Sequence, residues 1–195
     1  VALRGPRFPG VSLSVRNPLV LRSVGSNTDV VELLQQLVRV KFGESPYLDP
    51  KDMVESVMPH VSEATDGELS VMLWALGLSG ARLSHFEELG MWDKLDTRLA
   101  SIKDVEDEQG LALMRTIARA PRGFADVETR SLPPYTPLSI ALIKGIADMG
   151  ITWRQLTRSS RVALEKVVRA QLASESFDTR GFLSIINALG NIKVF

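Results

Sequence analysis

The chain has 195 residues, 45% of them hydrophobic and 24% charged, which is enough to bury a core without disulfides or structural metal. Its 23 basic and 23 acidic residues balance, which excludes a protein that binds nucleic acid over its entire surface. The absence of cysteine excludes disulfide scaffolds, thiolate catalysis and cysteine-ligated metal sites. The longest nearly uncharged apolar segment, Leu69–Ala81, is shorter than the ~20 residues of a membrane-spanning helix, so we expect no membrane insertion.

Residues 1–27 form a segment of their own. It contains four arginines and no acidic residue before Asp29: Arg4, Arg7, Arg16 and Arg22. Such Arg-rich, acid-free segments are typical of organellar transit sequences, and the missing initiator Met indicates a processed chain or a fragment. Proline and glycine interrupt any long helix here. We therefore predict a basic extended arm that becomes ordered on an anionic partner such as RNA, with a flexible tail as the alternative.

Residues 28–195 are predicted to be all-α, because apolar residues recur at three- and four-residue intervals and strand patterns are nearly absent. One phrase occurs twice without a gap, as LSVMLWALG at Leu69–Gly77 and FLSIINALG at Phe182–Gly190. Each copy follows residues suited to cap a helix. Weaker copies occur at Leu33–Val38, Leu111–Ala118 and Leu138–Ala147.

The spacing of these phrases predicts a helical repeat. Equivalent positions are separated by roughly 39, 42, 28 and 43 residues: Leu37, Leu76, Ala118, Ile146 and Leu189. Each of three intervals holds a further helix, at residues 51–64, 92–102 and 153–173. The short interval indicates that the fourth unit has lost its first helix. We predict an α-solenoid of stacked helical hairpins with repeats of about 40 residues, with a compact helical bundle as the alternative.

The two clear copies of the phrase carry small residues at matching places: Ala75, Gly77, Ala188 and Gly190. These are expected to let neighbouring helices approach closely. The helix at Leu69–Leu76 is apolar on nearly every side and is expected to be covered by several neighbours. The last helix is followed by no polar tail, so it is expected to pack against a partner or a continuation of the chain.

Two of the intervening helices open with Trp-x-x-Leu, at Trp92 and at Trp153. Together with the phrase ending in Ala-Leu-Gly, this pattern resembles the octotricopeptide and heptatricopeptide repeat proteins of mitochondria and chloroplasts, over roughly Thr28 to Phe195. The fourth unit departs from the pattern. The resemblance implies a helical solenoid, an organellar location and RNA binding through a concave face, often without enzymatic activity.

The helix predicted at residues 153–173 carries the most informative polar surface. Its arginines and one acid fall within an arc of roughly 80°, opposite an apolar side. Guanidinium groups bind phosphate through charge-assisted hydrogen bonds, so this stripe suits a nucleic-acid backbone, and a solvated helix face is the alternative. The candidate RNA-binding residues are Arg154, Arg158, Arg161, Lys166 and Arg169, with Arg4, Arg7, Arg16 and Arg22 of the arm.

Other residues give no sign of catalysis, of a metal site or of a cofactor. His60 and His85 are far apart, and we expect surface or capping roles for both. The acidic cluster of residues 104–108 is predicted to cap a helix rather than bind Mg²⁺. The three tryptophans lie in apolar helical rows and are expected to pack in the core.

The sequence therefore predicts a non-catalytic RNA-binding and structural subunit of an organellar ribonucleoprotein, most plausibly the mitochondrial ribosome. RNA, expected to be rRNA, would contact the arm and the 153–173 helix. Acidic surface at Glu44–Glu68 and Glu87–Glu108 and the apolar faces would contact neighbouring protein subunits. The alternative is a protein-only scaffold subunit of a mitochondrial respiratory or ATP-synthase complex.

Overall fold

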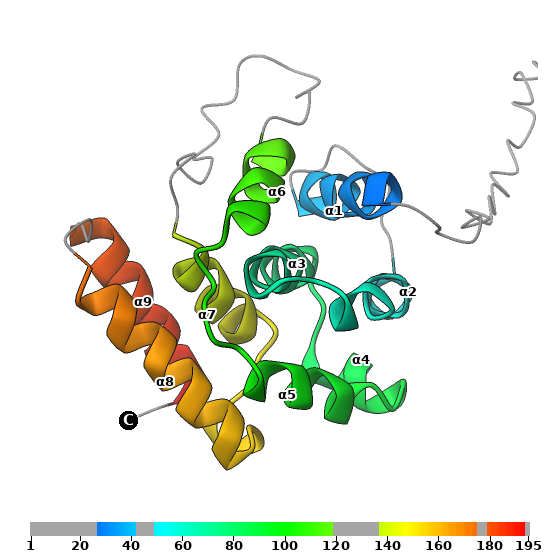
Figure 1. Ribbon diagram of the computed structural model, residues 1–195. Helices are drawn as coiled ribbons and strands as arrows, with labels where there is room; N and C mark the ends of the chain where they lie inside the picture. Colours follow the sequence, from blue (N-terminus) through cyan, green and yellow to red (C-terminus); the bar gives the residue numbers. More distant parts are fainter. Residues whose placement is uncertain (1–26, 42–48, 119–136, 175–178, 194–195) are drawn as a thin grey trace, which may run out of the picture.

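The computed structural model describes residues 27–41, 49–118, 137–174 and 179–193, and these ranges contain α-helices and no strand (Figure 1). The all-α prediction is therefore confirmed. The helices are α1 (Asn27–Lys41), α2 (Pro50–Val57), α3 (Asp66–Ser79), α4 (Leu83–Glu88), α5 (Trp92–Ala100), α6 (Glu108–Ala118), α7 (Leu138–Asp148), α8 (Arg158–Leu172) and α9 (Thr179–Ile192). Short 3-10 turns lie at His60–Ser62 and Trp153–Gln155. No described helix is long and apolar enough to span a bilayer.

The centre of the fold is α3. It begins with a capping box, in which the Thr65 hydroxyl accepts from the Glu68 N–H and the Glu68 carboxylate accepts from the Thr65 N–H. Every residue from Leu69 to Gly77 is buried, because α1, α2, α6 and α7 all contact this helix. A helix without a polar face is stable only when covered in this way, as the sequence predicts.

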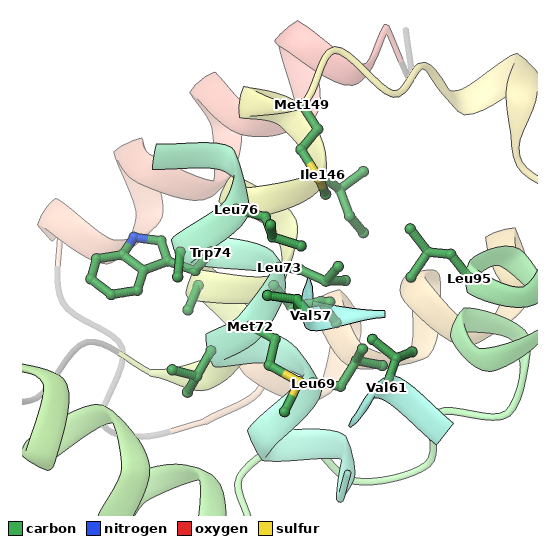
Figure 2. Close-up of a cluster of buried hydrophobic side chains, with 14 of the residues drawn as sticks. Val57, Val61, Leu69, Met72, Leu73, Trp74, Leu76, Leu95, Ile146 and Met149 are labelled. Atoms are coloured by element: carbon green, nitrogen blue, oxygen red, sulfur yellow. The ribbon is translucent and has the colours of Figure 1, made fainter. Parts of the chain in front are cut away.

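The closest helix crossing joins α3 to α7. A methyl group built on Gly145 would lie 2.6 Å from the backbone carbonyl of Leu73, and one on Gly77 would lie 2.9 Å from the carbonyl oxygen of Gly145. Only glycine allows the two backbones to approach this closely. Figure 2 shows Leu76 of α3 pointing towards Ile146 of α7, with Trp74 directed to the other side. The expected close approach is thus confirmed at Gly77.

A second close approach joins the N-termini of α3 and α6. The backbone of Gly67 lies within 2.5 Å of a methyl group built on Gly110. Asp107 accepts hydrogen bonds from the backbone N–H groups of both glycines, each at 2.7 Å. Glu106 accepts from the N–H groups of Leu138 and Ser139 at the start of α7. Two consecutive carboxylates therefore cap three helices, which neutralises three positive helix ends at one place.

Several predicted boundaries are wrong. The helix expected at residues 51–64 ends at Val57 and continues as a 3-10 turn, and the helix expected at 153–173 begins only at Arg158. The lost helix of the fourth unit falls in residues 119–136, outside the described part of the chain. Among the phrase helices, α6 contacts both α1 and α3. The phrase helices therefore do not form one linear stack in which each contacts only its neighbours in the chain, so a solenoid of repeats is not confirmed.

Candidate nucleic-acid interface

The candidate interface is the outer face of α8. This helix begins at the Thr157 cap, whose hydroxyl accepts from the Ser160 N–H. Its inner face is buried and contacts α5 and α7: Ser160, Ala163, Leu164, Val167 and Gln171. The amphipathic pattern expected from the sequence is confirmed from Arg158 onwards.

Hydrogen bonds at both ends fix the rotation of α8. The Asp96 carboxylate of α5 accepts from the Thr157 N–H at 3.2 Å, and the Ser160 hydroxyl donates to the Asp96 carbonyl at 2.8 Å. At the other end, the Ser139 hydroxyl of α7 lies 2.7 Å from the Gln171 side-chain oxygen. Because two of these contacts are buried and the third is partly buried, the outward side chains are presented on a rigid support.

The two arginines near the start of α8, Arg154 and Arg161, differ in role. Arg154 lies in the 3-10 turn, not on the helix, and its side chain is exposed. The Arg161 guanidinium turns back and donates to the carbonyls of Leu156 and Arg154, at 3.0 and 3.2 Å. Arg161 therefore holds the turn to the helix with two of its donors, and its role in RNA binding stays a prediction.

Three further cations lie on the exposed side of α8. Arg169 forms an ion pair with Glu165 one turn earlier, at 2.6 Å, and both side chains are exposed. Arg158 and Lys166 are exposed and form no ion pair with any other described residue. The free cations of the face are thus Arg154, Arg158 and Lys166. Arg154 and Arg158 lie at the positive end of the helix dipole, where an anion would be stabilised.

Apolar side chains on the same face were missed by the sequence reasoning. Val162 and Leu172 are each 45% exposed and lie between the charged residues of α8. Their exposure could have been predicted from the sequence. Val162 and Leu172 lie one turn after Arg158 and Arg169, and at 100° per residue this places them on the same outer arc of the helix. The face is therefore mixed, and it suits a partner with both anionic and apolar groups.

The acidic residues near the start of α3 and α6 hold helix ends in place. Burial alone would raise the pKa of Asp66, but hydrogen bonds from the Lys103 N–H, the Arg98 guanidinium and the Asp104 N–H hold this pKa below its usual value. The Arg98–Asp66 pair is close, at 2.7 Å, and largely buried. Within the described residues no cluster of potential metal ligands forms. The capping interpretation is supported by Glu106 and Asp107, which accept from helix N-termini.

The remaining candidates are placed as follows. Arg4, Arg7, Arg16 and Arg22 lie outside the described residues. His85 has the expected capping role, because its Nδ1 accepts from the Arg82 N–H at 3.1 Å. Trp74 is buried, and Trp92 and Trp153 are half-buried against the core. All three tryptophans therefore contribute to core packing, as expected from the sequence.

Comparisons with known proteins add no identification. No family model matches the sequence, and no curated protein or solved structure matches it.

Proposed function

We propose that the protein is a non-catalytic RNA-binding and structural subunit of an organellar ribonucleoprotein, most plausibly the mitochondrial ribosome. The observation that carries the proposal is the outer face of α8, where Arg154, Arg158 and Lys166 are exposed without acidic partners among the described residues. Arg158 and Lys166 lie on the helix and Arg154 lies in the turn before it. Arginine and lysine on such a rigid support bind phosphate oxygens irrespective of base sequence. The organellar location rests on the arm composition and on the resemblance to octotricopeptide and heptatricopeptide repeat proteins.

A helical solenoid remains part of this proposal. The helices α1, α3, α7 and α9 contact one another in chain order, which supports a stack of phrase helices. The contacts of α6 with α1 and α3 favour the bundle alternative in the first half of the chain. RNA binding through α8 does not require the stack to be regular.

The decisive experiment is RNA binding by the full chain as a function of salt. Replacing Arg158 and Lys166 with Glu should lower the affinity for a structured organellar RNA and reduce the slope of log K against log salt by about two, because two phosphate contacts are lost. Fluorescence anisotropy with labelled RNA measures both quantities.

The matched control is Lys103→Glu, which reverses an exposed charge in the acidic loop far from α8 in sequence. It should leave affinity and slope unchanged. The control changes the net charge half as much as the double variant does, so a loss in the control of about half the double variant's loss would show that only net charge matters. Unchanged binding in the double variant would refute α8 as the RNA contact.

The second candidate function is a protein-only scaffold subunit of a respiratory or ATP-synthase complex. It is favoured by the exposed apolar side chains of α8 and by the ion pair that engages Arg169. Absence of RNA binding at low salt, together with sedimentation in an RNase-resistant particle from a mitochondrial lysate, would select this alternative.

A further inference from the structure

The exposed apolar surface of the described chain is confined to its last two helices. Large hydrophobic side chains with 40% exposure or more occur only there: Val162 and Leu172 on α8, and Phe182, Leu183 and Ile186 on α9. On α9 the three residues lie on one side of the helix, together with Gly190. Isolated exposed apolar residues are ordinary, but such a contiguous group marks an interaction site.

The crossing of α3 with α7 shows what the corresponding side of α3 contacts. In α3, Gly77 and the backbone at Leu73 face α7, where Gly145 supplies the small residue on the other side. The opposite side of α3, at Met72, faces α1 and α6 and lines the groove between them. Helix α3 thus has one side for α1 and α6 and another side for α7.

The same two sides can be identified on α9 by aligning the two copies of the phrase. Ile185 corresponds to Met72, and it is buried, as α9 packs on α7, its preceding neighbour (Figure 1). Ile186 and Gly190 correspond to Leu73 and Gly77, yet Ile186 is 40% exposed. A methyl group built on Gly190 meets nothing within 4 Å. Among the described residues, the side of α9 that corresponds to the α7-facing side of α3 is therefore open at Ile186 and Gly190.

We propose that this side of α9 is a docking site for a helix of a partner protein, packed as α7 packs on α3. The partner helix carries a Gly at the crossing point, opposite Gly190, because the pairing of two glycines is what brings α3 and α7 together. The site continues the existing row of contacts from α1 through α3 and α7 to α9, so it extends an interface type already present in the fold.

Charge selects the kind of helix that fits. The exposed charged side chains described on α8, together with Lys193 directly after α9, are cations except for one: Arg158, Lys166, Arg169 and Lys193, with Glu165 as the acid. A partner helix with acidic residues at its flanks would therefore be favoured over a basic one. A second copy of the chain would bring this basic end of the fold against itself and place like charges together, so a different protein is the occupant to which we commit.

The test uses the full chain and a helix-stapled, fluorescein-labelled peptide of residues 138–148, the sequence of α7. Saturable binding is expected by fluorescence anisotropy. Ile186→Asp and Gly190→Leu in the protein should each weaken it by about 10-fold or more, the first by charging the apolar side and the second by blocking close approach. Gly145→Leu in the peptide should do the same, although leucine favours the helix more than glycine does.

The matched control is Val162→Asp, which charges an equally exposed apolar residue on α8 and should change binding less than about two-fold. Circular dichroism would confirm that every variant retains its helix content. A peptide affinity that is unchanged by Ile186→Asp, or no saturable binding at all, would overturn the proposal. So would a chain that dimerises in sedimentation velocity and loses the dimer on Gly190→Leu. Because no RNA is present, failure here is distinguishable from failure of the RNA-binding proposal.

Discussion

The two clear copies of the phrase, in α3 and α9, have nearly the same sequence pattern and opposite surroundings. In α3 every phrase residue is buried between four helices, whereas the buried residues described on α9 lie on the side towards α7. Gly77 lies in a backbone crossing, while its counterpart Gly190 meets nothing within 4 Å. The comparison teaches that the phrase encodes a helix with two binding sides, and that its position in the fold decides whether both are used.

The largest expected contrast is in large-to-small substitutions at matching positions. Leu73→Ala removes a fully buried side chain and should lower the free energy of unfolding by about 2–5 kcal/mol. Ile186→Ala, its counterpart in α9, should cost about 0.5 kcal/mol or less because the side chain is already solvated. Urea denaturation of both variants measures the difference, and similar losses would contradict the exposed placement of α9.

Alanine substitutions at Gly145 and Gly190 should change the stability of the fold in opposite directions. Gly145→Ala places a methyl group against the backbone of Leu73 and should destabilise the fold by about 1–3 kcal/mol. Gly190→Ala adds a methyl group in open space within a helix and should stabilise the isolated chain by about 0.5–1 kcal/mol. Thermal unfolding in the same buffer compares them, and a loss at Gly190 would show that this glycine already has a close neighbour.

The junction of helix N-termini beside α3 predicts an acid sensitivity. The pKa of Asp66 is lower in the folded chain than its ordinary value of 3.8. Its contribution to stability is therefore fully present above pH 3.8 and is lost as the pH falls through the lower, folded pKa. Asp66→Asn should flatten this part of the pH–stability curve, measured by urea denaturation at pH steps below 5. A variant with the same acid dependence as the parent would contradict the Arg98–Asp66 interaction.

The smallest expected effect on stability is at Glu165, on the outer face of α8. Glu165→Gln breaks an exposed ion pair with Arg169 and should change the free energy of unfolding by about 0.5 kcal/mol or less. It also removes the one acid of this face and releases a guanidinium. RNA affinity should therefore rise and the salt slope should steepen by about one. Unchanged RNA affinity would count against phosphate binding at this surface.

The candidate interface could be predicted only in part. The spacing of Arg158, Glu165 and Arg169 places them on one exposed arc, and the structure agrees. The inward turn of the Arg161 guanidinium could not be predicted, because it depends on where the 3-10 turn ends and leaves two carbonyls without partners. Likewise, the start of α8 at Arg158 follows from Asp96 of α5, which binds the Thr157 N–H across 61 positions of sequence.

Local periodicity and capping residues were sufficient to determine that the body is helical, that α3 has no polar side, and that Gly77 permits a close crossing. These properties depend on residues within a few turns of one another, so the sequence displays them directly. Only the tertiary structure shows which helices pack against one another. Glu106 and Asp107 join three helix ends, and the neighbours of α3 and α9 differ although their sequences match, because packing depends on partners that are distant in the chain.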